Sequence, residues 1–307
     1  MLMQSTYTYT SILHDAIKVD WQVADLIGGD KQLDFTKSFL PEALVGSDAI
    51  ECLNAREKLL LNQIRGKSYL HLFVLVEEFI IPMVWAQLQR KGYRDADALH
   101  ALLCFTEEEG KHIRLFQNFA AAFDRGFNTP CAGVEPREEI AKQVLTYHPL
   151  SVLLLTLQFE WTTQSHYLES VRDNHAENLD RCFSNLLKYH WLEEAQHTKL
   201  DALLLYELVP TMPDREIEIA IEDYLKLVTI LNEILMAQVQ LDLVSLQAAI
   251  SRPLTTANLQ EIQSHQSQAY RWAFLCTGLT HPNFVKILND ISPTLKTRVT
   301  ALAQSLS

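Results

Sequence analysis

The chain has 307 residues, 48% of them hydrophobic, and its 26 Lys and Arg against 38 Asp and Glu give a net charge of −12. This apolar content excludes intrinsic disorder, and the acidic balance argues against a nucleic-acid or anionic-membrane partner. Only 9 Gly and 10 Pro occur, with no Gly between Gly133 and Gly278, which is too few turn residues for a β-sandwich or barrel. We therefore expect an all-α fold.

The N-terminus and the five cysteines are typical of a soluble, cytoplasmic protein. The first residues lack the basic region and apolar stretch of a signal peptide. The most apolar window, residues 69–88, contains His71, Glu77, Glu78 and Pro82, which a lipid-facing helix would not carry. The cysteines are odd in number and include no C-x-x-C, which indicates reduced, mostly buried thiols. We expect no membrane partner.

In chain order, breaker residues and a 3.6-residue apolar period predict an irregular leader followed by long helices. The leader, residues 1–46, contains one predicted helix over residues 11–27. A four-helix core follows over residues 47–209, with helices predicted at about 47–90, 95–123, 149–172 and 176–208, and a shorter one from about 138. A fifth long helix at 214–250 and two or three shorter ones complete a single domain, 1–307.

Two of the core helices carry the same short motif, E-E-x-x-H. It occurs at residues 108–112 in the second core helix and at residues 193–197 in the fourth. At 100° per residue, the inner faces of these helices carry Glu109 and His112, and His190, Glu194, His197 and Asp201. Charged groups on an apolar face are costly unless they are paired or bind metal. The repetition suggests two helical hairpins related by pseudo-symmetry.

The first and third core helices supply further carboxylates. Glu160 is the only charged residue in the apolar run SVLLLTLQFEW. On the first helix, Glu78 points away from the polar side, so Glu78 is the predicted inward carboxylate and Glu77 is the alternative. Glu78 precedes Glu109 by 31 residues and Glu160 precedes Glu194 by 34 residues. These lengths allow each hairpin to bring its pair of carboxylates to one level of the bundle.

Four inward carboxylates with two E-x-x-H histidines are typical of ferritin-like four-helix bundles that hold two metal ions. Bridging carboxylates neutralise two hard cations, and imidazoles leave positions open for oxygen. The predicted ligands are Glu78 or Glu77, Glu109, His112, Glu160, His190, Glu194 and His197. His190 is either a seventh ligand or an outer hydrogen-bond donor. Asp201 either fixes the His197 tautomer or begins an exposed surface. We expect two iron ions, with manganese as an alternative.

The motif H-x-x-x-E-x-x-H that begins at His190 completes a pattern that resembles the aureothin-type p-aminobenzoate N-oxygenases. That family has one Glu on the first core helix, E-x-x-H on the second, one Glu on the third and H-x-x-x-E-x-x-H on the fourth. The stretch RWAFLCTGLTHPNFVKILNDISP is also similar to that family's C-terminal part, and the resemblance covers roughly residues 45–300. It implies that all seven residues bind iron and that the reaction oxidises an amine to a nitro group.

We therefore expect a non-haem di-iron oxygenase that uses O₂ to oxidise a small organic substrate. No G-x-G-x-x-G or other nucleotide signature occurs, so a separate reductase or ferredoxin is expected to supply electrons. A ferritin-like iron-storage protein, a ribonucleotide-reductase-like radical subunit and a metal-free bundle are the alternatives. The long segment after the fourth core helix favours the enzyme, because extra helices can wall a substrate pocket. A homodimer is possible, since the fifth helix is long enough to offer an interface.

Overall fold

The computed structural model describes residues 7–92 and 94–306, and all the named elements within them are helices. Four long helices form the core: α4 (Ala55–Lys91), α5 (Ala96–Gly126), α7 (Pro149–Ser170) and α8 (Arg181–Leu208). Helix α4 packs along α5, and α7 packs along α8, so the core consists of two helical hairpins. The prediction of an all-α fold built on a four-helix core is confirmed.

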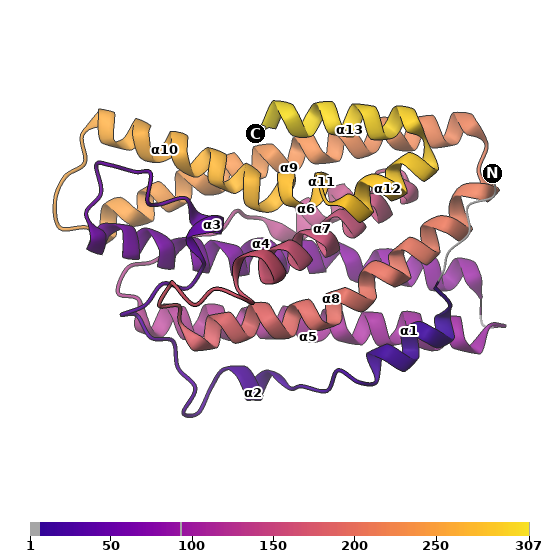
Figure 1. Ribbon diagram of the computed structural model, residues 1–307, viewed down its shortest axis with the longest axis horizontal. Coiled ribbons are helices and arrows are strands. Elements are labelled where there is room, and N and C mark those ends of the chain that lie inside the picture. Colours follow the sequence, from indigo (N-terminus) through magenta and orange to yellow (C-terminus); the bar gives the residue numbers. More distant parts are fainter. Residues whose placement is uncertain (1–6, 93, 307) are drawn as a thin grey trace.

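The other helices cover two opposite sides of this core (Figure 1). On one side, α1 (Tyr9–Ala16) and α2 (Val23–Leu26) lie against α5 and α8. On the other side, α9 (Asp214–Ala249) lies along α4 and α7. The shorter helices are α3 (Glu42–Val45), α6 (Arg137–Val144), α10 (Thr256–Arg271), α11 (Thr277–Leu279), α12 (Pro282–Ile291) and α13 (Pro293–Leu306). A 3₁₀ turn, Val209–Thr211, follows α8, and a π-helical turn, Trp272–Cys276, joins α10 to α11.

Polar caps fix where the core helices begin. The side chain of Asn54 accepts hydrogen bonds from two backbone N–H groups in the first turn of α4. Asp95 caps α5 and Asp180 caps α8 in the same way. Such side chains satisfy amides that the first turn of a helix leaves without partners. The caps explain why α4 begins at residue 55 instead of about 47, and α8 at residue 181 instead of about 176.

The leader also differs from the prediction. A single helix was expected over residues 11–27, but α1 and α2 are separated by a turn and an extended stretch. This break lets Trp21 enter the space between α5 and α8, where only 3% of its surface is exposed. Burial of one large aromatic side chain is worth more than the few helical hydrogen bonds that the break removes.

By length and composition alone, α4 and α9 are each apolar enough to cross a membrane. The most apolar window of α4 is 67% buried inside the fold, and that of α9 is 44% buried. Core helices of soluble proteins have the same length and composition, so the expected absence of a membrane partner stays a prediction.

Candidate metal centre

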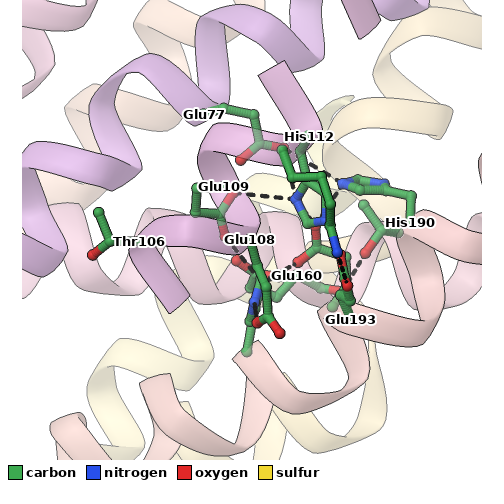
Figure 2. A network of polar contacts seen from close by, with 12 residues as sticks. Glu77, Thr106, Glu108, Glu109, His112, Glu160, His190 and Glu193 are labelled. Carbon is green, nitrogen blue, oxygen red and sulfur yellow. Dashed lines mark hydrogen bonds and ion pairs between the residues drawn. The ribbon is translucent and has the colours of Figure 1, made fainter. Parts of the chain in front are cut away.

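Seven carboxylate and imidazole side chains converge between the four core helices (Figure 2). All are at most 2% exposed: Glu77 on α4, Glu109 and His112 on α5, Glu160 on α7, and His190, Glu194 and His197 on α8. Ligand atoms of two overlapping groups lie within 4.8 Å of one another: Glu77, His112, His190 and Glu194, and Glu109, His112, Glu194 and His197. The two groups share His112 and Glu194, and a carboxylate common to two such groups is the arrangement expected for two adjacent ions.

Glu77, not Glu78, is the carboxylate that α4 brings to this cluster. Glu77 Oε1 lies 3.4 Å from His190 Nε2 and 3.9 Å from His112 Nδ1. Glu78 is only partly buried, and the nearest charges to it include Arg137 at the start of α6. The first choice from the sequence is therefore corrected, and the alternative residue takes its place.

The physical reason is that the polar residues of α4 do not mark its solvent face. Asn62 and Arg65 are 3% and 1% exposed. The Asn62 side chain accepts from the Phe39 N–H at 2.7 Å and donates to the Leu40 carbonyl at 2.7 Å. The Arg65 guanidinium donates to the Leu44 carbonyl at 3.0 Å. The leader segment covers this side of the helix. The polar residues therefore did not mark the solvent-exposed face of α4, and the inward face predicted from them was wrong.

The two E-E-x-x-H motifs interlock across helices α5 and α8. Nε2 of His112 donates to Glu193 Oε2 at 2.9 Å, and Nε2 of His197 donates to Glu108 Oε2 at 2.9 Å. Nδ1 of each ring faces the central carboxylates. The first Glu of each motif therefore orients the histidine of the other motif and leaves Nδ1 for a metal ion. Carboxylates in this position fix the tautomer and raise the basicity of the imidazole.

Glu108 and Glu193 are functional candidates that the sequence analysis missed, although the doubled Glu of each motif was the available signal. Their surroundings differ. The Glu193 side chain is 1% exposed and is paired with the Lys111 ammonium group, which lies 4.2 Å above the ring of Trp21. The Trp21 ring is stacked almost parallel to that of His112, with centroids 6.3 Å apart. The Glu108 side chain is 15% exposed.

Burial and mutual charge set the protonation of the cluster. Burial, reinforced by neighbouring carboxylates, raises the pKa of Glu77 and that of Glu160 well above the usual range. Burial alone would lower the pKa of His112, but the surrounding carboxylates raise it to about 10. For His197 too, burial lowers the pKa but the nearby carboxylates raise it by more, so the pKa is well above its usual range. Each of these shifts favours the protonated form, and divalent cations would replace those protons.

The residues fit a pair of metal ions. Among the described residues, Glu77 Oε2 and Glu160 Oε2 have no hydrogen-bond partner, although both are buried. Buried polar atoms need a partner, and bound cations would provide one for both. His190 Nε2 lies 2.5 Å from Glu194 Oε1, so this ring points into the cluster. Carboxylate oxygen and imidazole nitrogen suit iron and manganese.

Asp201 does not hold His197. Both oxygens of Asp201 lack a hydrogen-bond partner within the described part of the chain, and the residue is 0% exposed. The ring nitrogens of His197 instead contact Glu108, Glu109 and Glu194 at 2.9, 2.9 and 2.8 Å. Both sequence-based expectations for Asp201, a tautomer-fixing contact and an exposed surface, are therefore wrong.

No known protein family matches the sequence, and no curated protein is similar to it. Among solved structures, the fold is similar to an R2-like ligand-binding oxidase with an aerobically reconstituted Mn/Fe cofactor, with a TM-score of 0.45 and 14% identity over 88% of this chain and 92% of that chain. A mutant of an R2-like ligand-binding oxidase with a non-activated Mn/Mn cofactor has a TM-score of 0.46 and 16% identity, over 88% and 92% of the two chains. This degree of similarity assigns neither a family nor an activity to the chain.

Proposed function

We propose that this chain is a dimetal oxidase that uses O₂ to oxidise a small organic substrate. One observation carries the proposal: three carboxylates and three imidazoles, all at most 2% exposed, meet with their ligand atoms together, and a fourth buried carboxylate, Glu160, lies 3.8 Å from His197 Nδ1. A polar core that only stabilised the fold would have its donors and acceptors paired, whereas two buried carboxylate oxygens of this cluster, Glu77 Oε2 and Glu160 Oε2, have no hydrogen-bond partner among the described residues.

The geometry supports a specific division of ligands. Glu77, His112 and His190 surround one position, and Glu160 and His197 surround the other. Glu109 and Glu194 lie between them, within 3.4 Å and 3.2 Å of His112 Nδ1 and within 2.9 Å and 2.8 Å of His197 Nδ1. Two iron ions, or manganese, held there would supply the electrons and Lewis acidity that O₂ reduction needs.

The remaining residues around the site orient the ligands and exclude water. Glu193 and Glu108 hold the two histidine rings from outside. Phe73 and Phe116 contact the His190 ring edge-to-face, with centroids 5.5 Å and 5.0 Å away. This apolar shell strengthens the electrostatic interactions inside the cluster and keeps its protons from exchanging freely with solvent.

The finer proposal is N-oxygenation of an amine, which rests on the seven ligand positions that resemble the aureothin-type N-oxygenases. A separate reductase or ferredoxin would supply electrons, since the chain has no nucleotide-binding motif. We propose a cytoplasmic location, because the cysteines are odd in number and include no C-x-x-C, which indicates reduced thiols.

The test is oxidation of p-aminobenzoate by the Fe(II)-loaded chain with O₂ and a chemical reductant. We expect a nitrogen-oxidised product from the wild-type chain and from Glu78→Gln, and none from Glu77→Gln, although these two residues are neighbours on one helix. Iron binding with O₂ uptake but no oxidation of any amine or other organic compound would favour iron storage and contradict the oxidase.

A further inference from the structure

Asp201 is a buried acid that the ligand set does not use. It lies on α8 one helical turn after His197, on the same face as His190 and Glu194. Its side chain is fully buried, and neither carboxylate oxygen has a hydrogen-bond partner in the described residues. Burial disfavours an ionised carboxylate in such a place, so the neutral acid is the stable form.

The charges around Asp201 agree with a protonated side chain. Burial is the main cause that raises its pKa well above the usual range, and the negative charges of Glu109 and Glu194 raise it further. His197 is the one neighbour that opposes this shift. The nitrogens of His197 already face Glu108, Glu109 and Glu194, so the ring has no hydrogen to give to Asp201.

A second buried oxygen without a partner lies at the same end of the cluster. Thr156 precedes Glu160 by one turn on α7, is 0% exposed, and its hydroxyl has no partner among the residues described. Helices α7 and α8 are antiparallel, because Glu160 is near His197 while Gln164, further along α7, binds Trp191, earlier on α8. Thr156 and Asp201 therefore both lie one turn beyond the ligands in the same direction.

We propose that Asp201 is the internal proton donor of this centre, linked to it by water that Thr156 and Asp201 hold. Ordered water is the usual partner of buried polar atoms that lack one, and these two side chains offer it both a hydroxyl and a carboxyl group. The inference rests on the proposed oxidase function.

The protons that the oxidation consumes explain why the centre needs a donor such as Asp201. Insertion of one oxygen atom of O₂ into a substrate releases the other atom as water, which takes two electrons from the external donor and two protons. Asp201 would supply one of these protons: its O–H bond breaks, an O–H bond forms on the oxygen that leaves as water, and the carboxylate then recovers a proton from solvent water. A positioned acid of this kind typically contributes about 10²–10⁴-fold to a rate.

Infrared spectroscopy of the anaerobic, Fe(II)-loaded chain tests, without any turnover, whether the Asp201 carboxyl group is protonated. Metal binding would remove the protons of Glu77 and Glu160, and Asp201 is then expected to give a C=O band of a buried, protonated carboxylic acid. We expect Asp201→Asn to lose this band and Thr156→Val to shift it, with two irons bound in each case. A loaded wild-type chain without the band, or Asp201→Asn that retains it, would overturn the inference.

Turnover provides the second readout. We expect Asp201→Asn to slow O₂-dependent oxidation by about 100-fold and to change the solvent deuterium isotope effect, and Asp201→Glu to recover much of the rate. An Asp201→Asn chain with wild-type rate and isotope effect contradicts the proposal. A wild-type chain that binds iron and keeps the infrared band but oxidises no substrate would instead contradict the proposed oxidase function.

Discussion

At the scale of single residues, the repeated E-E-x-x-H motif explains how two buried histidines acquire defined orientations. The second Glu of each motif faces the cluster, and the first reaches across to the histidine on the neighbouring helix. The two contacts are not equivalent, because the Glu193 side chain is 1% exposed and paired with Lys111, whereas the Glu108 side chain is 15% exposed. Water screens the second contact more than the first.

This difference predicts unequal effects of two substitutions. Glu193→Gln removes a buried negative charge beside His112, and we expect it to weaken Fe(II) binding about 10–100-fold. Glu108→Gln should weaken binding less, and Glu107→Gln, at an exposed position of the same helix, should leave it unchanged. Anaerobic Fe(II) titration measures all three. An equal effect of Glu107→Gln and Glu193→Gln would contradict the role given to Glu193.

Protonation of the ligands predicts how metal affinity depends on pH. Glu77, Glu160, His112 and His197 all have raised pKa values, which favour protonated forms that a cation must displace. Fe(II) affinity should therefore rise with pH up to about 10, the pKa of His112. Calorimetry in two buffers of different ionisation enthalpy counts the protons released. Binding without proton release would contradict this protonation of the cluster.

At the scale of elements, the apolar period identified every core helix, but it did not orient α4. That helix is buried on most sides, so its sequence lacks a clean polar face, and Asn62 and Arg65 bind the leader segment instead of water. Helices α5 and α8 retain exposed polar faces, and their inward residues were predicted correctly in position. Trp21 and the break in the leader depend on contacts distant in sequence, which local patterns do not contain.

The C-terminal helices press on the turn of α7 that carries Glu160. A Cβ atom on Gly278 would lie 2.3 Å from Thr162 Oγ1 and 2.5 Å from the Gln158 carbonyl oxygen. We expect Gly278→Ala to lower the free energy of unfolding by about 1–3 kcal/mol, measured by urea denaturation of the metal-free chain. Gly110→Ala is the matched control, because its Cβ would meet nothing within 4 Å and alanine favours the helix. Equal stability of the two variants would contradict this close approach.

At the scale of the whole molecule, the centre joins all four core helices, and the leader and the C-terminal helices cover them on opposite sides (Figure 1). Removing metal would therefore loosen contacts between both hairpins at once. A ligand that binds only the folded state stabilises it by about 2.7 kcal/mol at a concentration of 100 times its Kd. We expect Fe(II) to raise Tm by several degrees and a chelator to reverse the rise. An unchanged Tm would show that no metal joins the hairpins.

The central claim is that the buried carboxylates and imidazoles form a site for two metal ions. The most direct measurement is the number of irons bound per chain after anaerobic loading with Fe(II) and removal of excess metal. The account predicts two irons for the wild-type chain and for Glu78→Gln, and fewer for Glu77→Gln. Zero or one iron in the wild-type chain would contradict it, and the oxidase proposal would fall with it.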